Sequence, residues 1–138
     1  MRPEHVGLAM PDPIAAAAWY GRHLGWQTIR ASSGPPYAHF LRSPDGGTVI
    51  EFFNDPAVAD ADLWKVDAMQ GHLAFAVDDL ESQCERLVSA GAVVDGPTAS
   101  TPAGDRYVML RDPWGLPLQL ITRRVELGHD GREGDERS

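Results

Sequence analysis

Two short segments of the chain share one alternation of polar, small and bulky residues. Residues 5–10 read His-Val-Gly-Leu-Ala-Met, and residues 72–77 read His-Leu-Ala-Phe-Ala-Val. Successive side chains of a strand point to opposite faces of its sheet. Each segment therefore predicts a strand with one bulky face, suited to packing against a helix, and one face that carries a histidine beside small residues.

A helix is predicted directly after each of these strands. Asp12 is suited to the N-cap of the first helix, with Pro13 at its first helical position, and Asp78 and Glu81 have the spacing of a capping box at the second. Both helices are expected to end at a glycine, Gly25 and Gly91. The apolar stripes expected to cover the bulky strand faces are Ile14, Ala17, Ala18 and Gly21 in one helix, and Leu80, Cys84, Leu87 and Val88 in the other.

Three further strands are predicted in each half, so the two halves repeat one another. The last hairpin of each half turns on a stretch rich in Pro, Asp and Gly, and Glu51 or Gln119 lies four residues beyond its final glycine. His5 precedes Glu51 by 46 positions and His72 precedes Gln119 by 47. The predicted strands span 26–32, 37–43 and 48–53 in the first half, and 92–96, 105–111 and 116–122 in the second.

This repeat predicts an α+β fold of two tandem βαβββ modules that form a curved, partly closed mixed sheet with the helices outside. The modules are residues 1–53 and 72–122. Residues 54–71 are expected to form a linker with one helical turn, and the charged residues 123–138 a mobile tail.

Composition narrows the choice of partners. The formal net charge of −8 disfavours nucleic acids and anionic lipids, which reward clustered Lys and Arg. A single cysteine cannot form an internal disulfide, and neither a signal peptide nor an apolar run long enough to span a membrane is recognisable. We expect a cytoplasmic protein that acts on a small molecule.

Strand parity places His5, Glu51, His72 and Gln119 on the faces turned away from the helices. Half-buried imidazole and carboxylate groups without partners would cost several kcal/mol, which a metal ion would offset. Nitrogen and oxygen donors suit one divalent ion per site: Zn, Ni, Co, Mn or Fe. The alternative is a set of satisfied polar residues in a water-filled cleft, which four repeat-related positions disfavour.

These residues resemble the vicinal oxygen chelate superfamily, which includes glyoxalase I, fosfomycin-resistance enzymes, methylmalonyl-CoA epimerase, extradiol dioxygenases and bleomycin-binding proteins. The resemblance covers about residues 3–122 and lies in the two histidine-initiated strands, both helix starts and the ending Arg111-Asp-Pro-Trp-Gly-Leu-Pro-Leu-Gln-Leu120. It implies a glyoxalase-like fold and assigns the metal ligands to His5, Glu51, His72 and Gln119. Gln119 departs from the pattern, because most catalytic members carry a glutamate there.

The resemblance implies a metal-dependent enzyme of the lyase or isomerase type that removes a proton next to a metal-chelated carbonyl. Because glutamine is not a useful proton acceptor, Glu51 is predicted to be the catalytic base. One alternative is an Fe(II)-dependent dioxygenase that uses the two histidines and Glu51. The other is a non-catalytic drug-binding protein of the bleomycin-resistance type.

Predicted substrate contacts lie in the middle strands and the last turn of a half: Tyr37, His39, Arg106 and Trp114. Relatives of this length pair the first half of one chain with the second half of another. We therefore predict a homodimer in which His5 and Glu51 of one chain meet His72 and Gln119 of its partner, the alternative being a site closed within one chain.

Overall fold

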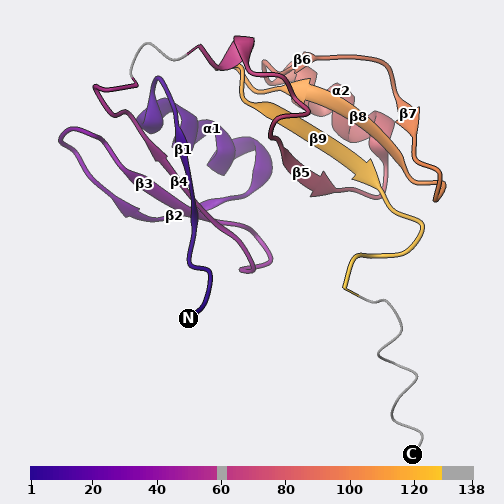
Figure 1. The fold of residues 1–138 in the computed structure, drawn as a ribbon, viewed down its shortest axis with the longest axis horizontal. Helices are drawn as coiled ribbons and strands as arrows, with labels where there is room; N and C mark the ends of the chain where they lie inside the picture. Colours follow the sequence, from indigo (N-terminus) through magenta and orange to yellow (C-terminus); the bar gives the residue numbers. More distant parts are fainter. Residues whose placement is uncertain (59–61, 129–138) are drawn as a thin grey trace, which may run out of the picture. The chain divides into compact units, whose positions relative to one another are not determined.

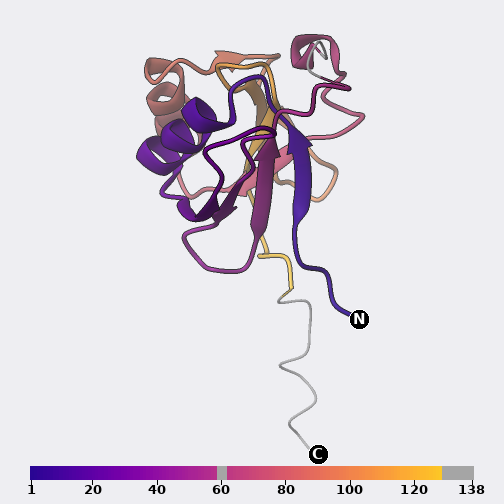
Figure 2. The same cartoon turned by 90° about the vertical axis from the view of Figure 1, so that its left-hand side faces the viewer.

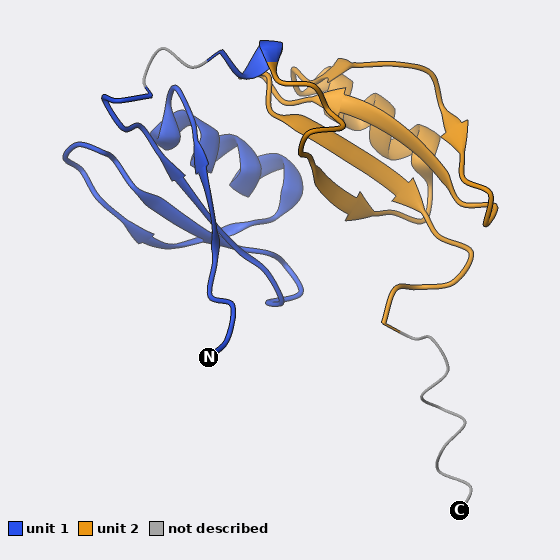
Figure 3. Cartoon of the chain, viewed as in Figure 1, with its two compact units in different colours: residues 1–65 blue, residues 66–138 orange. Residues whose placement is uncertain are grey.

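The computed structural model describes residues 1–58 and 62–128. The chain divides into two compact units, residues 1–65 and 66–138 (Figure 3). Each begins with a strand and a helix followed by further strands, with one additional short strand in the second unit (Figure 1). The division falls inside the segment predicted to be a linker, which contains one short helical turn, η1 (Leu63–Lys65). Residues 59–61 of that linker and 129–138 of the predicted tail lie outside the described residues.

The first unit is a four-stranded mixed sheet with one helix against one face (Figure 2). The strands lie in the order β1-β4-β3-β2, with β1 parallel to β4 and the other pairs antiparallel. The elements in chain order are β1 (Val6–Ala9), α1 (Pro13–Leu24), β2 (Gln27–Ala31), β3 (His39–Arg42) and β4 (Val49–Phe53).

The second unit repeats this plan in the order β5-β9-β8-β6, with β5 parallel to β9 and a short β7 also paired to β8. The α+β fold class is thereby confirmed, as two separate open mixed sheets. None of the helices among the described residues is long and apolar enough to cross a membrane. The elements are β5 (Leu73–Ala76), α2 (Leu80–Ser89), β6 (Val93–Val94), β7 (Ala99–Ser100), β8 (Arg106–Arg111) and β9 (Pro117–Thr122).

Both helices begin at a capping aspartate. Asp12 caps α1 as predicted, since its carboxylate accepts a hydrogen bond from the Ala15 amide. The predicted capping box of α2 is wrong by one residue, because Asp79 rather than Asp78 accepts from the Ser82 amide. Glu81, which the box would have used, instead accepts a hydrogen bond from Arg106 on β8.

The buried stripe of α1 is rotated from the predicted one. Ile14 is 54% exposed, whereas Tyr20 is fully buried with its ring 5.0 Å from Phe52. One residue of shift rotates a helix by about 100°, so a large aromatic side chain that fills the core decides which stripe faces the sheet. The buried residues of α1 are Pro13, Ala16, Ala17 and Tyr20.

The second helix buries part of its predicted stripe. Leu80 and Leu87 are buried, whereas Val88 is 43% exposed. Partial burial and two neighbouring glutamates raise the pKa of the Cys84 thiol, as expected of a packed cysteine rather than a nucleophile.

Candidate functional site

The two sheets share one register between their parallel strands. Gly7 of β1 lies opposite Glu51 of β4, and Ala74 of β5 lies opposite Gln119 of β9. Each histidine stands two positions before its Gly or Ala, and alternation puts it on the face of the carboxylate or amide. The repeat found in the sequence therefore extends to the pairing of residues across the parallel strands.

His5 and Glu51 form what we call the first half-site. Nε2 of His5 lies 3.6 Å from Oε1 of Glu51, and the two side chains are 31% and 21% exposed. This separation is too long for a hydrogen bond. Donor atoms that share one ion at bond lengths of about 2.0–2.2 Å lie roughly 3–3.6 Å apart, so the pair is spaced as two ligands of one metal would be.

Two neighbours set the shape of the first half-site. A Cβ atom at Gly7 would lie 3.3 Å from Oε1 of Glu51, so the glycine leaves the room that the carboxylate occupies above β1. Phe40 of β3 pairs with Glu51 and meets the His5 ring edge-on at 5.1 Å. Phe40 was not predicted as a site residue. The available signal was its strand parity, which is opposite to that of His39 and Leu41 and places it on the half-site face.

Both candidate histidines have the same ring nitrogen engaged. Nδ1 of His5 lies 2.9 Å from a carboxylate oxygen of Glu4, and Nδ1 of His72 lies 2.8 Å from the carbonyl oxygen of Ala68. Both partners accept hydrogen bonds and cannot donate them, so in the neutral imidazole each Nδ1 carries the proton and each Nε2 a lone pair. Metal-binding histidines are held in this way by a second hydrogen-bonded group. Glu4 was also missed, because its role depends on side-chain direction rather than on spacing.

We call His72 and Gln119, which strand parity and register put on one face of the second sheet, the second half-site. The side-chain amide nitrogen of Gln119 lies 3.7 Å from the sulfur of Met109, which occupies on β8 the place that Phe40 occupies on β3. Since the amide nitrogen of Gln119 faces the Met109 sulfur, its amide oxygen is the atom able to bind a cation. This half-site has an amide where the first has a carboxylate.

Two imidazoles, one carboxylate and one amide oxygen are a donor set that suits Zn, Fe, Mn, Co or Ni. Over the described residues, 1–58 and 62–128, no group of three His, Cys, Asp or Glu side chains could hold an ion. Each unit by itself offers two of the four donors. A complete set therefore needs one half-site of each kind.

Two of the predicted substrate contacts, His39 and Arg106, lie on the helix sides of their sheets, opposite the faces that carry the half-sites. His39 pairs with the core residue Phe52, is 9% exposed and has Nδ1 2.7 Å from the carbonyl oxygen of Tyr37. Arg106 has the strand parity opposite to that of Met109, so its side chain lies on the helix side of β8, where it donates a hydrogen bond to Glu81. That hydrogen bond holds the pKa of Glu81 below its usual range. Strand parity turns both His39 and Arg106 toward the helices and away from the half-site faces, and a role for either in substrate binding stays a prediction.

The other two predicted contacts lie in loops. Tyr37, with a φ of 57°, is in the loop between β2 and β3, and its carbonyl oxygen is bonded by His39. Trp114 is in the turn between β8 and β9, where its amide donates to the carboxylate of Asp112. A role for either in substrate binding stays a prediction.

Comparison with known proteins gives one family. A family model described as the Glyoxalase/Bleomycin resistance protein/Dioxygenase superfamily matches residues 2–120. The lactoylglutathione lyase of Salmonella typhimurium is 28% identical over 130 residues, which are 90% of this chain and 94% of the relative. The probable lactoylglutathione lyase of Vibrio cholerae is 26% identical over 136 residues, 94% and 95% of the two chains.

Solved structures show the same fold. A glyoxalase-related enzyme from Fulvimarina pelagi superimposes with a TM-score of 0.68 at 24% identity, over 95% of this chain and 96% of that one. The fosfomycin resistance protein FosX from Listeria monocytogenes, solved with Mn(II) and a sulfate ion, gives 0.68 at 16% identity, over 91% and 92%. At these identities the likeness concerns the fold alone.

The hydrogen bonds at Nδ1 generate a spectroscopic prediction. In nitrogen-correlated NMR spectra of the metal-free protein, at a pH where the rings are neutral, His5 and His72 should both show a protonated Nδ1 and a lone pair on Nε2. Glu4→Ala should release this tautomer preference at His5 and leave His72 unchanged, because His72 is held by a main-chain carbonyl. A protonated Nε2 at His72 would contradict the geometry.

Proposed function

The chain belongs to the glyoxalase/bleomycin resistance protein/dioxygenase superfamily, and from this premise we propose that it is a metal-dependent enzyme of the lyase or isomerase type. The observation that supports this best is the first half-site, where Nε2 of His5 and the Glu51 carboxylate stand 3.6 Å apart. The reaction would be removal of a proton from the carbon next to a chelated carbonyl, followed by its return to a neighbouring atom.

In this proposal His5, Glu51, His72 and Gln119 hold one divalent ion per site. The bound ion would supply a Lewis acid that polarises a substrate carbonyl, with positions beyond its four protein ligands open to substrate oxygens. His5 and His72 serve through Nε2, and the hydrogen bonds at Nδ1 fix the orientation of both rings.

Glu51 is the proposed base. It is the single carboxylate of the proposed set, since an amide stands at the repeat-related position 119. Its side chain is partly exposed, so a substrate can reach it, and the small residue Gly7 beside it leaves room for the carboxylate to turn. One base that takes a proton and returns it to an adjacent atom suffices for an isomerisation but not for a two-base epimerisation.

The named relatives suggest the substrate class. Both lactoylglutathione lyases match more than nine-tenths of their own length, which supports an adduct of an α-ketoaldehyde with a thiol. A second candidate is an Fe(II)-dependent dioxygenase, which the two-histidine, one-carboxylate composition of the set also fits. The bleomycin-resistance type of binding protein receives no separate support from the half-site geometry.

We further propose that the protein works as a homodimer. Each unit offers one half-site, so a complete site requires a first and a second half-site to meet. Pairing the first half-site of one chain with the second half-site of another gives two sites related by a twofold axis, the commonest symmetry of protein oligomers.

The asymmetry between positions 51 and 119 gives a test of the base. Glu51→Gln should lower turnover of the methylglyoxal–thiol adduct by about 10²–10⁴-fold, the usual contribution of a general base, while metal is still bound. Gln119→Glu, which adds a carboxylate at the matched position, should keep or raise metal affinity and serves as the control. Steady-state kinetics and metal analysis of the same preparations decide the matter. Wild-type turnover in Glu51→Gln would remove Glu51 as the base.

Mixing two inactive variants tests the shared site. A His5→Ala chain and a His72→Ala chain, unfolded and refolded together, should recover activity if sites are shared between chains. A mixed dimer then holds one doubly damaged and one intact site, so random pairing restores about a quarter of the wild-type activity. If each site lies within one chain, every site stays damaged and the mixture has no more activity than its components.

A further inference from the structure

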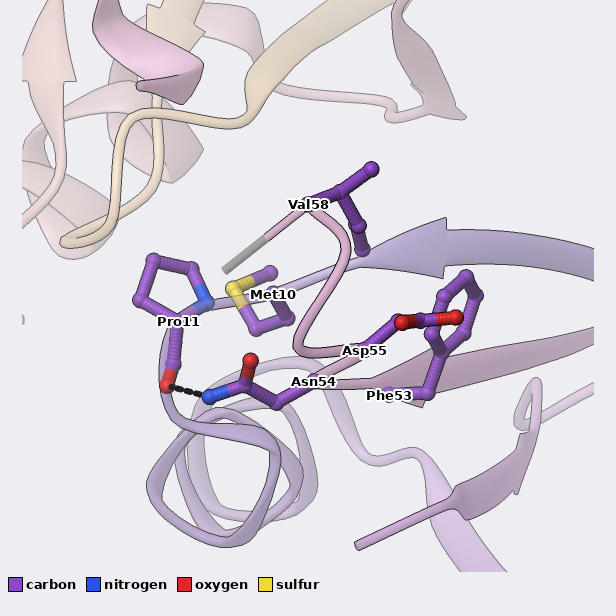
Figure 4. Close-up of a pocket in the computed structure, with 7 residues that line it drawn as sticks. Met10, Pro11, Phe53, Asn54, Asp55 and Val58 are labelled. Carbon is purple, nitrogen blue, oxygen red and sulfur yellow. Dashed lines mark hydrogen bonds between the residues drawn. The ribbon is translucent and has the colours of Figure 1, made fainter. Parts of the chain in front are cut away.

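The segment that connects the two units, residues 54–71, is held near each of its ends by a side chain that donates to a main-chain carbonyl. At its start, the side-chain amide of Asn54 donates to the carbonyl oxygen of Pro11 at 3.0 Å (Figure 4). Toward its end, Nη2 of Arg111, the last residue of β8, donates to the carbonyl oxygen of Val66 at 2.8 Å. The second contact lies shortly before β5, so it bears on the second half-site.

Arg111 joins three segments of the second unit through three different nitrogen atoms. Besides the Nη2 contact with Val66, its Nε donates to the Asp95 carboxylate at 2.8 Å and its Nη1 to the carbonyl oxygen of Gly115 at 3.1 Å. The Arg111 side chain is 11% exposed. A guanidinium is stable away from water only where its charge is paired and its N–H groups are bonded, so these contacts fix the three segments relative to one another.

The residues that follow Val66 form a turn closed by their own side chains. The Met69 amide donates to the Asp67 carboxylate at 2.8 Å, and the Gln70 amide donates to the carbonyl oxygen of Asp67 at 2.9 Å. The Asp67 amide in turn donates to the side-chain oxygen of Gln70 at 3.3 Å. These reciprocal bonds give the turn one backbone shape and so set the direction of the Ala68 carbonyl group.

That carbonyl group is the partner of the His72 ring. The carbonyl oxygen of Ala68 lies 2.8 Å from Nδ1 of His72, so the turn orients a candidate metal ligand. The bonds within the turn set its shape but do not attach it to the sheet. The contact between Arg111 and Val66, one residue before the turn, attaches it to β8. Hydrogen bonds and a short stretch of main chain thus connect the Arg111 guanidinium to the His72 imidazole.

The first repeat has an arginine at the matched position but treats it differently. Arg42 on β3 and Arg111 on β8 each end their strand, two positions beyond the residue paired with the candidate donor of that half. Arg42 is exposed, whereas Arg111 is buried. His5 has its Nδ1 beside the carboxylate of the adjacent Glu4 and therefore does not depend on a segment anchored from β3. Arg42 provides a matched control.

We propose that Arg111 is a positioning residue of the second half-site: it anchors the turn at residues 67–70, so that the Ala68 carbonyl keeps Nδ1 of His72 as the donor and leaves Nε2 to an ion. This assignment rests on the function proposed above, in which His72 is a metal ligand. It gives a role to the first residue of the stretch 111–120, on which part of the family resemblance depends.

The metal-free full chain tests this without any turnover. Arg111→Met removes the guanidinium, so nitrogen-correlated NMR spectra at a pH where the rings are neutral should show both tautomers of His72 instead of the Nδ1-protonated form alone. Arg42→Met should leave His72 unchanged. Affinity for Zn²⁺, measured by competition with a chromophoric chelator, should fall about ten-fold in Arg111→Met, the lower end of the usual effect of groups that orient a metal ligand.

Two further variants separate positioning from stability. Arg111→Lys keeps the charge beside Asp95 but has one nitrogen in place of three, so it should fold, as circular dichroism can show, and still lose the His72 preference. Asp95→Asn removes the charge pair and leaves both carbonyl contacts, so its melting temperature should fall while the His72 spectrum stays as in the wild type.

A wild-type His72 spectrum in Arg111→Lys, or in a folded Arg111→Met, would overturn the proposal, because Arg111 would then only stabilise the fold. Equal loss of the His72 preference in Asp95→Asn would overturn it as well. A changed His72 tautomer with unchanged Zn²⁺ affinity would instead contradict the metal site proposed above and leave the orienting role of Arg111 intact.

Discussion

The candidate site depends on one constraint, the register of the parallel pairs β1/β4 and β5/β9. A slip of one residue would turn Glu51 or Gln119 to the helix side, because side chains alternate across a sheet. The observed register sets Gly7 opposite Glu51 and Ala74 opposite Gln119. The small residues Gly7 and Ala74 leave space above each sheet for a histidine and for Glu51 or Gln119. Strand register and side-chain size therefore both determine the candidate site.

Much of this arrangement was predictable, because it follows from local rules. A two-residue period fixes which side chains share a face, and a helix cap followed by a glycine fixes where α1 begins and ends. The helix stripes were less predictable, since burial of Tyr20 against Phe52 rotates α1 away from the Ile14 stripe. Such a choice depends on how side chains from distant segments fill one space, which spacing along the chain does not encode.

The site residues show the same limit. His5, Glu51, His72 and Gln119 follow from the repeat, whereas Glu4 and Phe40 become apparent only when side-chain directions are known. His39 and Arg106 were expected near a substrate because of their place in the middle strands, yet each is paired on the helix side of its sheet. Strand parity is thus a better indicator of a role in the site than the proximity of a polar residue to the site in sequence.

The two repeats share one strand order and one register, and they differ in the residues at the candidate site. The first has a carboxylate in its half-site, while the second has an amide at the matched position. Each repeat thus holds one histidine and one further candidate donor, so neither unit alone holds all four candidate residues.

The central claim is that one half-site from each repeat binds a single metal ion, and X-ray absorption spectroscopy tests it most directly. Protein loaded with one equivalent of Zn²⁺ per chain should show two imidazole nitrogens at about 2.0–2.1 Å with oxygen donors beside them. His5→Ala and His72→Ala should each remove one imidazole, while His39→Ala, on the opposite face, should change nothing. An unchanged two-imidazole spectrum in the His5→Ala, His72→Ala double variant would contradict the account.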